Sequence, residues 1–261
     1  MTSSAAAGVT DGRNREVGMI TADPSPTLIA LIAHEEIDFL VLDAEQTSLT
    51  VQRCAEVVQS LAGSRTKVAV RVPELDELTL VSFANTGVDE IVLPRITQVS
   101  QLESAWHSVR FPPLGCRPKQ ASFASKFGQD FSTAPRLTVL FETVEAVAAV
   151  DDFVTSEFFD GGWVGPSDLA QDLALIGRSG SDELRIATQT VLDALVAAGH
   201  SVGLPAPSIA RVAEVHERGV DRVAIYWERE LASIIRDFSA IRGLAPRANG
   251  GRNEATVDKL M

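Results

Sequence analysis

Residues 137–168 read LTVLFETVEAVAAVDDFVTSEFFDGGWVGPSD, and this stretch carries the pattern that decides the fold. The runs Leu137–Phe141 and Phe159–Val164 are short and apolar on both faces, as strands of a buried parallel sheet are. Between them, Val144–Thr155 has the spacing of an amphipathic helix. The stretch therefore predicts one strand–helix–strand unit.

The same alternation extends over most of the chain. The other expected strands are Val17–Thr21, Ile37–Leu42, Lys67–Val72, Glu90–Leu93, Ser201–Leu204 and Arg222–Tyr226. The other expected helices are Pro26–His34, Thr50–Ala62, Glu74–Asn85, Val99–Val109, Glu183–Ala198, Pro207–Arg218 and Glu228–Ile241. Eight such units predict an α/β fold, a (β/α)₈ TIM barrel forming one domain over residues 16–243. A doubly wound open sheet is the alternative.

The charge of the chain limits its partners. Its 261 residues carry 23 Lys and Arg against 35 Asp and Glu, a formal net charge of −12. This argues against binding to nucleic acid or to an anionic membrane. Two cysteines make no disulfide framework, so we expect a reduced, cytoplasmic protein. Residues 1–15 and 244–261 are expected to be flexible tails.

The segment from Thr97 to Pro135 is too long for a plain connection between a strand and the next. Loops of this size are often binding loops, so we expect it to have such a role. Its Arg117, Lys119 and Lys126 could supply the basic groove near the barrel mouth that a coenzyme A thioester requires, and a solvated loop is the plainer interpretation of the same residues.

Charged side chains follow the expected strands at the end where TIM barrels carry function. They are, in strand order, Asp43, Glu45, Arg71, Arg95, Glu142 and Asp168. Four carboxylates and two guanidinium groups are thus expected to meet at one mouth. Helix caps and surface ion pairs are the plainer interpretation of the same residues.

Two of these carboxylates are the natural ligands of a metal ion. Glu142 and Asp168 follow neighbouring strands, and carboxylates brought together away from water stay ionised only beside a cation. Mg²⁺ or Mn²⁺ takes one or two carboxylates and leaves its other positions to water and substrate. With Arg71 as a fixed cation, the set favours stabilisation of an enolate. No lysine ends an expected strand, which disfavours a Schiff base.

Five motifs occur in a recognisable order. They are DFLVLDAE over 38–45, VRVP over 70–73, FPPLGCR over 111–117, FETVEA over 141–146 and VGPSDL over 164–169. In this order they resemble the HpcH/HpaI aldolase family, the class II pyruvate aldolases that include 4-hydroxy-2-oxoheptanedioate aldolase. The resemblance extends from Val17 to Ile241.

The resemblance implies a TIM barrel that assembles as a homo-oligomer, a trimer or hexamer, and that cleaves 4-hydroxy-2-oxo acids to pyruvate and an aldehyde, or makes them. It implies that Glu142 and Asp168 hold a divalent ion (Mg²⁺, Mn²⁺ or Co²⁺) and that Arg71 polarises the 2-oxo group. The N–H groups of Ser167 and Asp168 would bind the substrate carboxylate. The implied substrate-binding set is Arg71, Gly165, Pro166, Ser167, Asp168 and Leu204.

The chain departs from the family pattern on the second strand. The family motif D-G-E-H ends in a His near the catalytic base, whereas this chain has Ala44 and Gln46. The family also has Gln where this chain has Leu140. Asp43, Glu45 and Gln46 are candidates for catalytic residues. Because Gln cannot move a proton at neutral pH, the replacement base would be Glu45 or a metal-bound water.

The predicted function is a metal-dependent carbon–carbon lyase that acts on a 2-oxo acid through a pyruvate-type enolate. A citrate-lyase-β-like or citrate-synthase-like enzyme with an acyl-CoA partner is the first alternative. A non-catalytic barrel that binds an oxo acid is the second.

Overall fold

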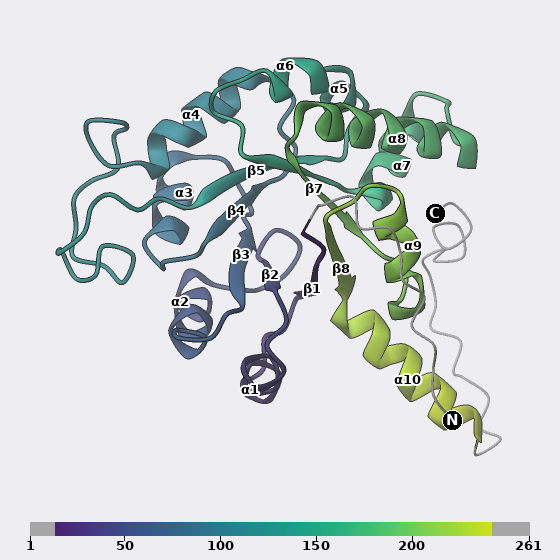
Figure 1. Ribbon diagram of the computed structural model, residues 1–261, viewed down its shortest axis with the longest axis horizontal. Coiled ribbons are helices and arrows are strands. Elements are labelled where there is room, and N and C mark those ends of the chain that lie inside the picture. Colours follow the sequence, from purple (N-terminus) through teal and green to yellow (C-terminus); the bar gives the residue numbers. More distant parts are fainter. Residues whose placement is uncertain (1–13, 242–261) are drawn as a thin grey trace.

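The computed structural model describes residues 14–241, and their strands form one closed barrel (Figure 1). The order around the barrel is β1 to β8, and every neighbouring pair is parallel, including β8 with β1. The strands are β1 (Glu16–Thr21), β2 (Phe39–Asp43), β3 (Lys67–Arg71), β4 (Glu90–Leu93), β5 (Arg136–Phe141), β6 (Gly161–Val164), β7 (Ser201–Pro205) and β8 (Arg222–Tyr226). The TIM barrel is confirmed. Apart from Asn14 and Arg15, the expected tails lie outside the described residues.

The helices lie outside the barrel (Figure 1). They are α1 (Pro26–Glu35), α2 (Val51–Ser60), α3 (Glu77–Ala84), α4 (Val99–Val109), α5 (Val144–Ala148), α6 (Val150–Val154), α7 (Pro166–Leu175), α8 (Ser181–Ala198), α9 (Val212–Glu217) and α10 (Trp227–Ile241). The segment expected as one helix over Val144–Thr155 is two helices, α5 and α6. Helix α7 was not predicted, although a proline at the first helical position is a helix-start signal.

Strand alternation divides the core into two layers. Phe39, Val41, Ala69, Val92, Leu140, Trp163 and Ala224 fill the inside of the barrel. The residues between them, such as Leu40 and Leu42, belong to the larger layer under the helices. Because side chains alternate with a period of two, Asp43, two residues beyond Val41, points inward at the carboxyl end of its strand. The same parity turns Arg71, Glu142 and Tyr226 toward the mouth.

A buried ion pair closes the amino end of the barrel. Arg222 Nη1 lies 2.6 Å from Glu90 Oε2, and Glu90 Oε1 also accepts hydrogen bonds from Thr138 and Trp163. Burial raises the pKa of Glu90, but Arg222 and these hydrogen bonds outweigh it, so the pKa lies below its ordinary value. The mouth that remains for chemistry is therefore the carboxyl end.

The long loop lies at the opposite end of the barrel from that mouth. It connects α4 to β5, and Arg117, which is completely buried, donates from Nη2 to Asn85 Oδ1 at the end of α3, 2.8 Å away. Lys126 forms an ion pair with Asp130. The prediction of a basic groove near the mouth is wrong, because a helix-to-strand connection returns the chain to the amino ends of the strands.

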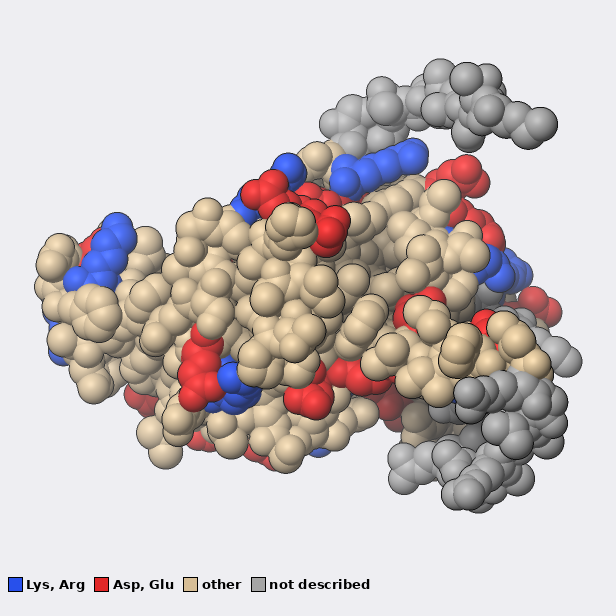
Figure 2. Space-filling view, turned by 90° about the horizontal axis from the view of Figure 1, so that it is seen from below, with Lys and Arg blue, Asp and Glu red and all other residues tan. Residues whose placement is uncertain are grey.

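The described surface carries charges of both signs. On the face in Figure 2, acidic side chains interrupt the basic ones, and no continuous basic band crosses it. Among the helices within residues 14–241, none is long and apolar enough to cross a bilayer.

Candidate active site

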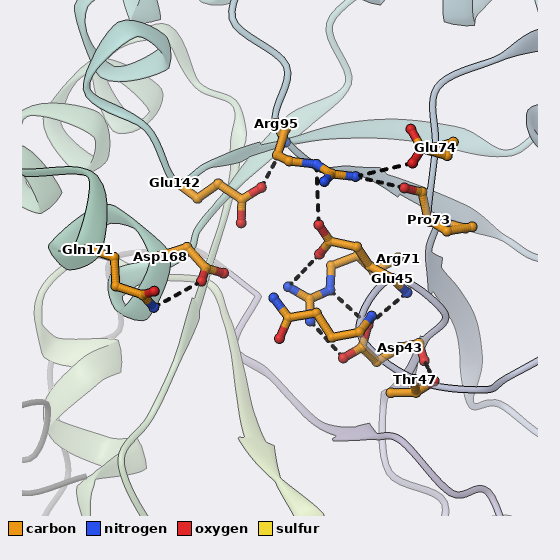
Figure 3. Close-up of polar contacts among 11 residues, drawn as sticks. Asp43, Glu45, Thr47, Arg71, Pro73, Glu74, Arg95, Glu142, Asp168 and Gln171 are labelled. Atoms are coloured by element: carbon orange, nitrogen blue, oxygen red, sulfur yellow. Dashed lines mark hydrogen bonds and ion pairs between the residues drawn. The ribbon is translucent and has the colours of Figure 1, made fainter. Parts of the chain in front are cut away.

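Arg71 is held rigidly at the mouth by Asp43. The two residues are register partners on β2 and β3. Arg71 donates from Nε to Asp43 Oδ1 at 3.0 Å and from Nη2 to Oδ2 at 2.7 Å, a two-pronged contact seen in Figure 3. Burial lowers the pKa of Arg71, but the bonds to Asp43 more than offset it, so the pKa lies above its ordinary value. The guanidinium is a permanent, oriented cation.

The turn after β2 packs around the same pair. Backbone N–H groups of Glu45 and Gln46 donate to Asp43 Oδ1, at 3.1 and 3.4 Å. Asp43 therefore positions Arg71 and the turn, and its oxygens are not free for substrate. The side chain of Gln46 is exposed and does not line the cavity described below.

Glu45 lies between the two guanidinium groups. Its Oε2 is 3.1 Å from Arg71 Nη1, and its Oε1 is 3.5 Å from Arg95 Nε. Burial raises the pKa of Glu45 above its ordinary value, although both arginines oppose the rise. Because the oxygens of Asp43 are taken up by Arg71 and by the turn, and an amide does not titrate, Glu45 is the candidate among the three for proton transfer.

Glu142 and Asp168 point into one space beside Arg71 (Figure 3). Glu142 Oε1 accepts the Arg95 N–H at 2.7 Å, while its Oε2 is buried without a hydrogen-bond partner among the described residues. Burial, with the nearby charges of Glu45 and Asp168, raises the pKa of Glu142 to about 7. A buried carboxylate in this condition calls for a cation.

The donor set fits a hard divalent ion. An unpartnered oxygen of Glu142 and the carboxylate of Asp168 supply the oxygen ligands that Mg²⁺ prefers. Within residues 14–241, no group of three or more Asp, Glu, His or Cys side chains could hold a metal ion without further ligands. Mg²⁺ suits such an open site because it usually keeps several water ligands.

The first turn of α7 adds an anion site. Leu169 N–H is bonded to Gly165 O at 3.0 Å, whereas the N–H groups of Ser167 and Asp168 have no backbone partner among the described residues. Such N–H groups at a helix start favour anions. The unpredicted helix α7 thus explains physically why these two residues suit a carboxylate.

A mostly apolar cavity is lined by three of these groups, Arg71, Ser167 and Asp168, whereas Asp43, Glu45 and Glu142 are not among its lining residues. Its lining residues are Ile20, Val41, Arg71, Val92, Leu140, Trp163, Val164, Gly165, Pro166, Ser167, Asp168, Pro205 and Tyr226. Leu204, expected in the site, is completely buried in the layer under the helices, and its neighbour Pro205 lines the cavity instead. Strand parity places Leu204 outward. Tyr226 and Pro205 were not predicted as site residues, and strand parity places both at the cavity only once the fold shows which face of β7 and β8 is inside.

Gly165 leaves room for Glu142, which gives a first prediction. A Cβ on residue 165 would lie 2.9 Å from Glu142 Cβ and 3.3 Å from Oε2. Gly165→Ala should therefore displace the carboxylate and weaken Mn²⁺ binding, measured by calorimetry, by about 10–100-fold. Gly180→Ala is the matched control, because its Cβ would meet nothing closer than 3.7 Å. Equal affinities in the two variants would contradict the assignment of Glu142.

The chain is similar to known proteins over most of its length. The family described as HpcH/HpaI aldolase/citrate lyase matches residues 17–228. A 5-keto-4-deoxy-D-glucarate aldolase of Enterobacter sp. (strain 638) is 29% identical over 217 residues, 80% of this chain and 85% of that protein. A hydroxypyruvate/pyruvate aldolase of Agrobacterium fabrum is 25% identical over 222 residues, 82% of each chain.

Solved structures share the fold. An HpcH/HpaI aldolase/citrate lyase family protein from Burkholderia cenocepacia J2315 superposes with a TM-score of 0.80 at 23% identity, covering 89% of this chain and 96% of that one. The citrate synthase SbnG gives a TM-score of 0.73 at 21% identity, covering 88% and 92%.

Proposed function

The chain belongs to the HpcH/HpaI aldolase/citrate lyase family, and we propose that it is a metal-dependent aldolase that cleaves or forms 4-hydroxy-2-oxo acids through the enolate of pyruvate. The observation that carries the proposal is the buried, unpartnered oxygen of Glu142, which faces the same space as Asp168 beside Arg71. These groups suit one divalent ion and one developing negative charge.

The 2-oxo acid binds across the charged side of the cavity. Its carboxylate accepts hydrogen bonds from the N–H groups of Ser167 and Asp168, at the positive end of α7. Gly165 and Pro166 shape this turn and keep Glu142 close to it. The 2-oxo group then faces Arg71.

Each charged residue of the site has its own role in the proposed reaction. Glu142 and Asp168 would hold the ion, which supplies Lewis-acid stabilisation of the 2-oxo oxygen when bound. Arg71 stabilises the negative charge that spreads from the breaking C3–C4 bond to that oxygen. Asp43 keeps Arg71 oriented. Glu45, buried between Arg71 and Arg95, is the residue that we assign to proton transfer.

The acyl-CoA alternative lacks its expected groove. Arg117 is buried, and the loop that carries it lies at the amino end of the barrel, away from the mouth. Coenzyme A would require cations near the mouth, but Arg71 is paired with Asp43 and Glu45, and Arg95 is paired with Glu45 and Glu74. The aldolase assignment is therefore favoured over a citrate-synthase-like one.

A cleavage assay tests the proposal. Protein stripped of metal is mixed with 4-hydroxy-2-oxo acids, including 5-keto-4-deoxy-D-glucarate, the compound named in one relative, and released pyruvate is measured. We expect turnover only after Mg²⁺, Mn²⁺ or Co²⁺ is added, and which ion gives the fastest turnover identifies the preferred metal. Equal pyruvate release with and without metal would contradict the mechanism.

We also propose that the protein is a homo-oligomer joined through α10. This helix extends away from the barrel in Figure 1 and has no buried residue. One side carries an exposed apolar stripe, which comprises Leu231, Ile234, Ile235, Phe238 and Ile241. An apolar stripe with helical spacing suits burial against a second copy, and the trimer or hexamer implied by the family resemblance supplies one.

The two free cysteines, Cys54 and Cys116, agree with a reduced, cytoplasmic location.

The stripe gives a second prediction. Ile234 and Phe238 are 57% and 69% exposed, and replacing both with Asp should lower the molar mass measured by light scattering to that of a smaller assembly. Arg236→Asp is the control, because residue 236 lies on the other side of the helix. An unchanged mass in the double variant would contradict the assigned interface.

A further inference from the structure

By strand order, the cavity lining divides into two arcs. The arc from β3 to α7 carries the charged and anion-binding groups Arg71, Ser167 and Asp168, beside the apolar side chains of Val92, Leu140, Trp163 and Val164. The other arc consists of Ile20 on β1, Val41 on β2 and two residues contributed by β7 and β8, Pro205 and Tyr226. If the 2-oxo acid occupies the charged arc, as the proposed function requires, the aldehyde half of the substrate must lie against the second.

In that second arc, only Tyr226 has a polar side chain. It is the one tyrosine of the chain, and it pairs in register with Ile20 of β1. The guanidinium of Arg229 lies over its ring, 4.4 Å from the centroid, which restrains the ring. Among the described residues, no hydrogen bond from the Tyr226 hydroxyl is present. This hydroxyl is therefore a donor available to a ligand.

We propose that Tyr226 is a further catalytic residue, whose hydroxyl donates a hydrogen bond to the oxygen on C4 of the substrate. This oxygen is the carbonyl oxygen of the aldehyde before addition and the hydroxyl oxygen of the hydroxy-oxo acid after it. The proposal rests on the proposed function, because it assigns the acceptor side of that same reaction.

The bond changes define when this hydrogen bond matters. In the addition direction, C3 of the enolate forms the new bond to the aldehyde carbon, and the C=O π pair moves onto oxygen. The phenolic O–H stabilises the resulting alkoxide while keeping its own proton, and a proton transferred through Glu45, the residue assigned to this role above, completes the hydroxyl. Cleavage reverses each change. A donor aimed at an oxygen that gains charge only in the transition state raises kcat more than it lowers KM.

The surroundings favour a neutral donor at this position. Burial raises the pKa of Tyr226 above its ordinary value, although Arg71 and Arg229 oppose the rise. The phenol thus keeps its proton at neutral pH. Gln46, at the position where the family has its His, is exposed and outside the cavity lining. Tyr226 lies at the end of β8, two strands from β2, and it lines the cavity, whereas Gln46 does not.

The test separates the two halves of the reaction in the full-length, Mg²⁺-loaded protein. Exchange of the pyruvate methyl protons with deuterated water reports on enolate formation alone, whereas addition of pyruvate to acetaldehyde requires the acceptor half. Tyr226→Phe removes only the hydroxyl. We expect kcat for addition to fall by about 10²-fold, the typical effect of losing one oxyanion donor, with exchange within about twofold of wild type.

Each outcome of this test is informative. Equal losses of exchange and addition, or no loss of either, would overturn the assignment of Tyr226. Exchange by the wild-type protein without any addition to acetaldehyde would overturn it too. Absence of exchange in the wild-type protein would instead contradict the proposed function, so the two failures are distinguishable. Thermal unfolding of the variant checks that the fold is intact.

A second measurement uses no variant. Because the chain has one tyrosine, incorporation of ¹³Cζ-tyrosine gives a single NMR signal that reports on the phenol. We expect a small change with Mg²⁺ and pyruvate and a larger one when acetaldehyde is added. A signal that ignores acetaldehyde while addition proceeds would rule out contact with the C4 oxygen.

Discussion

Arg71→Met should lower kcat/KM for cleavage of a 4-hydroxy-2-oxo acid by about 10²–10³-fold, because it removes a preorganised donor for the enolate oxygen. The same change leaves the carboxylate of Asp43 without its cation and leaves Glu45 paired with Arg95 alone. Removing one partner of a buried ion pair costs about 3–5 kcal/mol of unfolding free energy, so denaturant unfolding should show a large loss of stability.

Arg71→Lys separates charge from geometry. Lysine keeps the positive charge but loses the planar fork that donates from Nε and Nη2 to Asp43. We expect stability to recover more than activity, because a lysine can pair with one carboxylate without being oriented by it. Full activity in Arg71→Lys would show that orientation by Asp43 is irrelevant.

Glu142→Gln should have the second large effect, on both metal binding and turnover. The amide oxygen can still accept the Arg95 N–H, which Glu142 Oε1 accepts at 2.7 Å, so the fold around β5 should be kept. The lost negative charge removes one of two assigned ligands. We expect Mn²⁺ affinity to fall by at least about 10²-fold, which is more than the loss caused by replacing a residue that only orients a metal ligand. The rate of cleavage should fall with it.

Glu145→Gln is the matched control for that variant. Residue 145 lies in α5, three positions further along, with its side chain exposed. It should bind Mn²⁺ and cleave substrate as the wild-type protein does. Equal losses in both variants would point to a general effect of charge and would contradict a ligand role for Glu142.

The strands were predictable because parallel barrel strands are buried on both faces. Segments such as Leu137–Phe141 are continuous apolar runs, and the observed β5 (Arg136–Phe141) differs by one residue. The residues that follow such runs then meet at one mouth, as Asp43, Arg71 and Glu142 do. Topology alone therefore assembled most of the candidate site.

What the sequence did not reveal depends on orientation and on long-range packing. A run that is apolar on both faces does not say which face is inside, so Leu204 was assigned to the cavity where Pro205 lies. Arg117 looked like a surface cation, but its partner Asn85 is distant in sequence and known only from the fold. Helix α7 was not predicted because Gly165 and Pro166 together are typical of a turn, and the turn was not interpreted as the start of a helix.

The central claim is that Glu142 and Asp168 hold one divalent ion beside Arg71, where a pyruvate enolate forms. Proton exchange of pyruvate in deuterated water, followed by NMR, tests it most directly because no second substrate is required. The account predicts loss of the methyl proton signal in wild-type protein with Mg²⁺ or Mn²⁺, and no loss after metal removal or in Glu142→Ala. Exchange that persists in Glu142→Ala or without metal, or that never occurs in the metal-loaded wild-type protein, would contradict it.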